Sequence, residues 1–151
     1  MNDIADLSPA TVRHALPFLV AGQVQKEFFV NEALARIDLL LHSSIDGQHS
    51  SPPATPAVGA VYLVTAPAVG DFAERDSCLA GWDGDQWTFV SPLPGMRILD
   101  RTSGTYLRFT SAWQASPAPV PAQGGATIDS EARAAIESIL AILRFAGLAG
   151  T

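Results

Sequence analysis

Five carboxylates gather on either side of one Asp-Gly turn, and these side chains are the first that could do chemistry: Asp71, Glu74, Asp76, Asp83 and Asp85. Carboxylate oxygens are ligands for Ca²⁺, and two carboxyl groups about 5–10 Å apart can hydrolyse a glycosidic bond. The ligand order of a calcium loop is absent, however, and nothing in the sequence positions an acid against a base. We therefore expect these residues to be solvated and to form turns.

The imidazole and thiol side chains are scattered along the chain. His14, His42 and His49 do not fall at metal-ligand spacing from one another or from Cys78. Cys78 is the single cysteine, so an intrachain disulfide is excluded, and a strand interior is its expected place. The chain also lacks a phosphate-binding glycine loop and a Gly-x-Ser-x-Gly elbow. We predict no catalytic residue, no metal and no cofactor, and hence a protein that is not an enzyme.

Aromatic side chains offer a different chemistry, since exposed Trp and Tyr rings stack on the C–H faces of sugars. Trp82, Trp87 and Tyr106 are the candidates for such stacking. In a domain this small most of its large rings are needed for the core, which is therefore the more common role for any one of them. The exposure of these rings decides between the two roles.

Composition limits the partners that this chain can have. Apolar residues make up 48% of its 151 residues and charged residues 16%, against roughly 25% charged in average soluble proteins. Part of the apolar surface is therefore expected to be covered by other subunits. The net charge of −6 and the nine scattered basic residues argue against nucleic acid and against an anionic membrane surface.

The same pattern bears on location. The first residues, 1–6, are acidic where a signal peptide would be basic, and no apolar run reaches the length of a membrane span. We expect synthesis in a bacterial cytoplasm.

The elements that position these side chains suggest an α+β fold. After an N-terminal arm over residues 1–15, a helix is predicted over 31–42, with Asn31 as N-cap and an apolar stripe of Leu34, Ile37 and Leu41. An Asp-Gly turn between aromatic runs predicts a hairpin. Short strands are expected at 60–65, 78–82, 86–90, 96–100 and 105–109. They predict a small antiparallel sheet packed on the helix, in a core domain over residues 16–113.

The C-terminal part is predicted to be separate from this core. Residues 114–126 are rich in Pro, Ala and Gly and read as a linker. A second helix follows within 127–147, with Asp129 as N-cap and Gly147 as its stop. Its apolar seam should dock on the domain, on a sister copy or on another protein, because so short a helix is marginal alone in water. The seam consists of Ile136, Ile139, Leu140 and Leu143.

Three blocks of sequence resemble a phage-associated family catalogued as domain of unknown function 2793. These blocks are residues 16–38, residues 52–64 and the segment 80–89, which reads Ala-Gly-Trp-Asp-Gly-Asp-Gln-Trp-Thr-Phe. The resemblance covers roughly residues 16–113 and supplies no catalytic residues. It implies a role in the head spikes or fibres of prophages and gene transfer agents, particles that contact the polysaccharide of a recipient cell.

The sequence and the resemblance together lead to two hypotheses. The first is a structural subunit of a gene-transfer-agent head spike or fibre, assembled with sister chains as a trimer or pentamer and with other capsid, spike or fibre proteins. Such a subunit would move from the cytoplasm into the particle. The alternative is a module that binds capsular polysaccharide directly through exposed aromatic rings.

Overall fold

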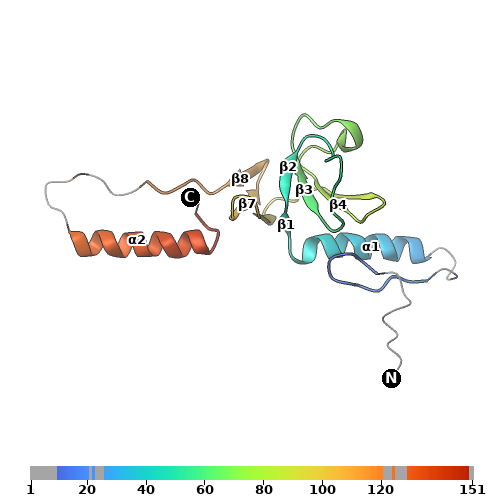
Figure 1. Ribbon diagram of the computed structural model, residues 1–151, viewed down its shortest axis with the longest axis horizontal. Helices are drawn as coiled ribbons and strands as arrows, with labels where there is room; N and C mark the ends of the chain where they lie inside the picture. The colour runs from blue at the N-terminus through green and yellow to red at the C-terminus, as the bar shows by residue number, and fades with distance from the viewer. Residues whose placement is uncertain (1–9, 21, 23–25, 121–123, 125–128, 150–151) are drawn as a thin grey trace, which may run out of the picture. The chain divides into compact units, whose positions relative to one another are not determined.

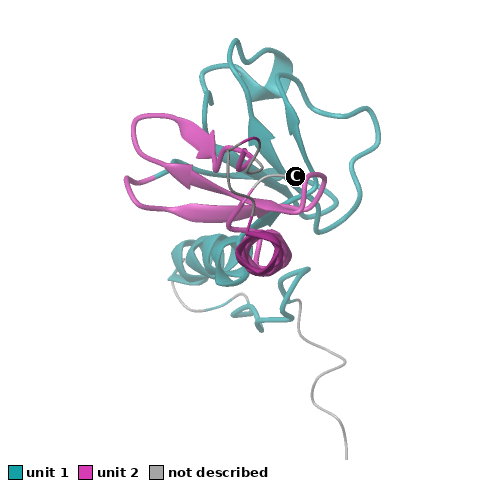
Figure 2. Ribbon diagram, turned by 90° about the vertical axis from the view of Figure 1, so that its left-hand side faces the viewer, with its two compact units in different colours: residues 1–92 teal, residues 93–151 magenta. Residues whose placement is uncertain are grey.

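The computed structural model describes residues 10–20, 22, 26–120, 124 and 129–149. The chain forms two compact units, residues 1–92 and residues 93–151, which are coloured separately in Figure 2. The predicted core domain 16–113 spans the boundary between them. No helix among the described residues is long and apolar enough to cross a bilayer.

Unit 1 combines one helix with a four-stranded sheet (Figure 1). Strand β3 pairs antiparallel with β4, and β4 with β5, as predicted, whereas β2 runs parallel to β3, so the sheet is mixed. The sheet order is β2-β3-β4-β5, which makes β5 an edge strand. The elements are α1 (Lys26–Leu41), β1 (Ser44–Ile45), β2 (Gly47–His49), β3 (Val61–Val64), the 3₁₀ turn η2 (Gly70–Phe72), β4 (Leu79–Trp82) and β5 (Trp87–Val90).

One face of this sheet carries an aromatic core. Phe72 is fully buried with Val64 and Ala80, and Trp87 and Phe89 pack against them. The Phe72 ring meets Trp87 and Phe89 edge-on, with centroids 5.0 and 5.9 Å apart. The shared face of Trp87 and Phe89 follows from the two-residue alternation of a strand, as predicted.

The other face of the sheet receives α1. Leu39 is buried, and a Cβ atom placed on Gly81 of β4 would lie only 2.7 Å from Leu39 Cδ1. The absence of a side chain at Gly81 therefore lets the helix approach the sheet closely. The predicted packing of a sheet on an N-terminal helix is confirmed.

The face that α1 buries differs from the predicted apolar stripe. Its buried residues are Asp38 and Leu39, whereas Ile37 and Leu41 are 47% and 51% exposed. The helix begins at Lys26, so Asn31 is not its N-cap. The Asn31 side chain instead accepts a hydrogen bond from the Leu19 N–H and donates one to the Leu19 carbonyl, at 2.9 and 3.0 Å. The predicted N-cap is therefore wrong, because this amide ties the preceding segment to the middle of the helix.

Unit 2 contains an antiparallel ladder and the second helix. The elements are β6 (Arg97–Asp100), β7 (Thr105–Phe109), β8 (Trp113–Ala115) and α2 (Ser130–Phe145). Strand β7 pairs antiparallel with both β6 and β8. Strands β6 and β7 match their predicted positions, while β8 occupies the start of the predicted linker, whose residues 121–123, 125 and 126 lie outside the described part of the chain.

The two ends of α2 are capped as predicted. The Asp129 carboxylate accepts a hydrogen bond from the Ala132 N–H at 2.8 Å. At the other end, Gly147 has a φ of +69°, and the N–H groups of Gly147 and Leu148 donate to the carbonyls of Arg144 and Leu143. This pair of bonds is a Schellman motif, which favours glycine because of the positive φ.

Candidate functional site: apolar helix faces and an aromatic groove

The outer face of α1 is apolar and exposed. Val30 and Leu41 are 40% and 51% exposed, Ile37 lies between them, and Ala33 is exposed beside it. These four residues are spaced three or four apart, so they form one stripe, which we call the α1 stripe. An apolar stripe on a helix normally faces a core. The α1 stripe thus has the composition of a packing surface but is open to solvent in the single chain.

Helix α2 also presents apolar side chains to solvent and has no buried residue. Of the four predicted docking residues, Ile136 and Ile139 are exposed and Leu140 and Leu143 are half-buried. Ile142 and Phe145, which the prediction left out, are 63% and 95% exposed. The helix therefore carries an apolar surface wider than the predicted seam, and its role in docking stays a prediction.

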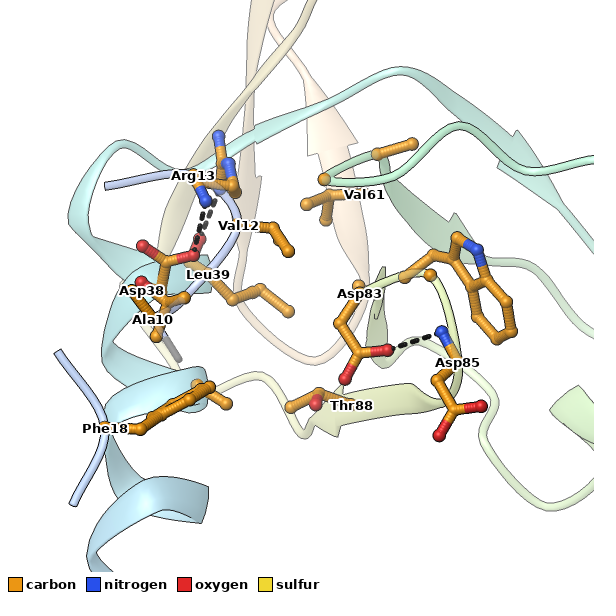
Figure 3. A pocket seen from close by; sticks show the side chains of 17 residues that line it. Ala10, Val12, Arg13, Phe18, Asp38, Leu39, Val61, Asp83, Asp85 and Thr88 are labelled. Atoms are coloured by element: carbon orange, nitrogen blue, oxygen red, sulfur yellow. Dashed lines mark hydrogen bonds between the residues drawn. The ribbon is translucent and has the colours of Figure 1, made fainter. Parts of the chain in front are cut away.

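A pocket of about 290 Å³ lies between α1, the segment that precedes it and the β4–β5 turn (Figure 3). Leu39 and Val61 line it, together with Gly81 and Trp82 from β4. One wall comes from a short segment that folds back on itself, with an isolated bridge between Ala10 and Pro17. We call residues 10–17 the strap; its residues 10–13 line the pocket.

A wider groove of about 630 Å³ runs between α1 and the edge strand β5. Trp87 and Phe89 of β5 line it, and the Arg75 guanidinium lies 5.0 Å from the centre of the Phe89 ring. The helix contributes Glu27 and the ion pair between Arg36 and Glu32, with 2.6 Å between Nη2 and Oε1. Glu27 Oε2 is buried and has no hydrogen-bond partner among the described residues. The groove thus brings aromatic residues of β5 together with charged groups of α1.

The three aromatic residues predicted for sugar stacking do not converge. Trp82 and Trp87 form a cross-strand pair with ring centroids 4.9 Å apart, and both are half-buried. Trp87 opens on the groove and Trp82 on the pocket. Tyr106 belongs to unit 2, where the Arg97 guanidinium lies 5.1 Å from its ring centre. Of the three predicted rings, only Trp87 lines the groove.

The carboxylates around the hairpin act as turn residues where the structure gives them partners. Asp83 Oδ1 accepts from the N–H groups of Asp85 and Gln86, at 2.8 and 2.7 Å, and Asp76 accepts from the Ala68 N–H. The predicted turn-forming role is therefore confirmed for Asp76 and Asp83. Within the described ranges, no three His, Cys, Asp or Glu side chains converge as a metal site would need. Cys78 is buried beside Ser91, 3.7 Å from its hydroxyl.

A hydrogen-bonded array that the sequence did not predict links the strap to the end of α1. The buried Asp38 carboxylate accepts from the backbone N–H groups of Arg13 and His14, at 2.9 and 2.7 Å, and Asp38 Oδ1 lies 3.0 Å from His14 Nδ1. His14 Nε2 then lies 3.1 Å from His42 Nδ1. The Arg13 guanidinium donates to the carbonyls of Leu39 and His42 and to the Ser44 hydroxyl. These partners are 24 to 31 residues apart in sequence, so local spacing gave no signal of them.

The array sets the ionisation of Asp38. Burial by itself would raise the pKa of this carboxyl group, but the hydrogen bonds from the Arg13 N–H, the Thr11 hydroxyl and His14 outweigh it. The pKa of Asp38 therefore lies below its ordinary value. The anchor of the array is a carboxylate at neutral pH.

Comparison with known proteins adds a family. No curated protein and no solved structure shows significant similarity to this chain. A family model described as "Protein of unknown function (DUF2793)" matches residues 30–114, more than half of the chain. The match spans most of α1 and the strands of both units, except the last residue of β8, and leaves α2 outside it. The chain therefore belongs to the DUF2793 family.

Proposed function

We propose that this chain is a structural subunit of a phage-like particle, a head spike or fibre of the gene-transfer-agent type, that supports attachment to a recipient cell. It assembles with sister chains, as a trimer or pentamer, and with other spike, fibre or capsid proteins. The observation that carries the proposal is the pair of exposed apolar helix faces, the α1 stripe and the outer surface of α2.

Large exposed apolar patches are rare on free monomers and are typical of the buried cores of obligate interfaces. The low share of charged residues, 16%, agrees with a chain whose surface is partly covered in its working state. The resemblance to phage-associated proteins supplies the kind of assembly.

Light scattering on the full chain tests the assembly. Wild type should show one defined oligomer, and Ile139→Glu on α2 or Ile37→Glu on α1 should reduce its mass, because each places a charge in an apolar contact. Ser138→Glu is the matched control, since Ser138 is an exposed polar residue of α2, and it should leave the mass unchanged. A wild-type monomer at high concentration would contradict self-assembly.

The particle assignment has its own test. Phage-like particles purified from a bacterium that carries the gene should contain this chain at a fixed ratio to the major capsid protein, measured by quantitative mass spectrometry. Particles from a deletion strain should assemble but adsorb poorly to recipient cells. Absence of the chain from purified particles would contradict the proposal.

A second candidate function, direct binding of capsular polysaccharide, is favoured by the groove along β5. Trp87 and Phe89 line it opposite the Arg36–Glu32 ion pair, so aromatic residues and charged groups that can hydrogen-bond a sugar lie together there. Sugars are commonly held by this combination of an aromatic surface with a few polar groups.

Calorimetric titration with purified capsular polysaccharide tests this second function. Arg75→Ala and Gln86→Ala alter exposed groove residues, and each should weaken binding by roughly tenfold, the equivalent of one good hydrogen bond. Gln114→Ala, at an exposed position of β8 in unit 2, is the control. Equal binding by all three variants would remove the groove from consideration.

A further inference from the structure

The contact between His14 and His42 is a head-on hydrogen bond. Their ring centroids are 5.3 Å apart, the planes differ by only 23°, and the two facing nitrogens are 3.1 Å apart. An imidazole nitrogen lies about 1.2 Å from its ring centre, so two such radii added to the N···N distance of 3.1 Å nearly equal the centroid separation of 5.3 Å. The rings therefore lie end to end and are not stacked face to face. There is room for one hydrogen atom on this axis and none for a metal ion.

Asp38 decides which protons this pair can hold. The distance of 3.0 Å between Asp38 Oδ1 and His14 Nδ1 places the proton of that contact on His14, because the carboxylate is an acceptor only. His14 Nε2 can then accept a hydrogen bond from an N–H group at His42 Nδ1. When His14 Nε2 carries a proton, it can instead donate a hydrogen bond to His42 Nδ1. A neutral pair and a pair with one extra proton both preserve the bridge. A pair with two extra protons does not, since two N–H groups would point at each other.

Protonation of the pair also changes the net charge of this group of side chains. The groups that face it are the Asp38 carboxylate, the Arg13 guanidinium and the carbonyls at the end of α1, with the neutral Ser44 hydroxyl. With a neutral pair, Asp38 balances Arg13. With two imidazolium rings, three cations surround one carboxylate.

The strap depends on this array. Its remaining contacts include the bond between the Thr11 N–H and the Leu16 carbonyl, which closes the strap on itself and not on the helix. Since residues 10–13 form one wall of the pocket over Leu39 and Val61, detachment of the strap would open that apolar surface.

We propose that the His14–His42 bridge is an acid-sensitive latch, which holds the strap over the pocket at neutral pH and releases it when both rings are protonated. The proposal is independent of the function given above. It needs only the chain itself and hydrogen ions, and it makes the pocket a surface that becomes accessible in mildly acidic surroundings.

Amide exchange in the full chain, followed by NMR, tests the latch. The Arg13 and His14 N–H groups donate to Asp38, so their protection factors report on the strap. Between about pH 7.5 and pH 5, the range in which imidazoles ordinarily titrate, these two protection factors should fall by about tenfold or more. Protection factors in β3 and β4 should stay constant, because the sheet is not part of the array.

Two variants and one spectrum make the test decisive. His42→Ala removes one ring, so its strap protection should no longer vary with pH, while the control His49→Ala, an exposed residue outside the array, should behave as wild type. Ring nitrogen spectra of wild type should show one donor and one acceptor at the facing nitrogens at pH 7.5 and two donors at pH 5. Constant wild-type protection, the same acid response in His42→Ala, or two acceptors at pH 7.5 would each overturn the latch.

Discussion

Asp38 anchors the strap, residues 10–17, to helix α1 through hydrogen bonds. It is only 3% exposed, yet it lies on a helix whose apolar residues Ile37 and Leu41 face solvent. A buried carboxylate is tolerated where donors surround it, and this one is served by the Thr11 hydroxyl, by two backbone N–H groups and by an imidazole. The strap therefore supplies the donors, and Asp38 in turn holds the strap against α1.

Replacement of this carboxylate should be costly. Asp38→Asn keeps the shape but substitutes an NH₂ group for one acceptor oxygen, so at least one donor of the strap loses its partner. We expect the free energy of unfolding to fall by about 2–3 kcal/mol at pH 7, measured by urea denaturation. Glu32→Gln, at an exposed position of the same helix, should cost less than about 1 kcal/mol. Similar costs for the two variants would contradict the anchoring role.

The lowered pKa of Asp38 predicts a pH dependence with a definite sign. A carboxyl group whose pKa is lower in the folded chain stabilises the fold at pH values above its ordinary pKa. That contribution is lost as the pH falls through the folded value. We expect the wild-type free energy of unfolding to decline below about pH 4, beyond the decline in Asp38→Asn. Parallel urea-denaturation profiles for the two proteins would show that Asp38 makes no such contribution.

At the scale of elements, the sequence predicted strands well and one helix face wrongly. Strands β3 to β7 were found from alternation and from the Asp83-Gly84 turn, signals that lie within a few residues of one another. Strands β1 and β2 were missed because they are only two and three residues long and largely polar.

The face of α1 could not be read from its own sequence. Periodicity locates an apolar stripe, but it does not say whether a core or a partner covers that stripe. Here the donors of the strap, more than twenty residues away, hold the Asp38 side inward. The groove had no sequence signal beyond Trp87, because Glu27, Arg36 and Arg75 come together only through the packing of α1 beside β5.

The close contact of α1 with β4 gives a prediction for Gly81. Gly81→Ala would place its Cβ within 2.7 Å of Leu39 Cδ1, so Leu39 must move within a filled site. The expected cost is about 1–3 kcal/mol in urea denaturation. In a Leu39→Ala background the same substitution should cost close to nothing, because the clashing atom is gone. An equal cost in both backgrounds would place the strain elsewhere.

Helix α2 should be sensitive to its cap, since no residue of it is buried. Asp129→Ala removes the acceptor for the Ala132 N–H and should destabilise the helix by about 1 kcal/mol, visible as lost helical signal in far-UV circular dichroism. Ser130→Ala is the neighbouring control, because its hydroxyl bonds Glu131 and not the helix backbone. The difference should shrink once α2 is held in an assembly.

At the scale of the whole molecule, the charge and the apolar faces act in opposite directions on association. Each chain carries a net charge of −6, so identical chains repel one another, while the α1 stripe and α2 attract. Salt screens the first effect and leaves the second in place.

Association driven in this way should not weaken when salt is added. We expect the oligomeric fraction, measured by light scattering between about 50 and 500 mM NaCl, to stay constant or increase. A marked decrease would indicate that ion pairs hold the chains together. Ile37→Glu should show a smaller oligomeric fraction at every salt concentration, because its added charge lies within the apolar contact itself.

The parallel pairing of β2 with β3 has a practical consequence. The chain between these strands, residues 50–60, returns alongside β2 with three prolines and without a helix, and Ala54 and Thr55 at its middle are exposed. Each doubling of such a loop costs only about 0.6 kcal/mol, and the register of the two strands does not depend on its length. A short epitope inserted between Ala54 and Thr55 should leave the fold intact. Copies of the chain could then be labelled and counted on intact particles, at a position remote in sequence from both helices.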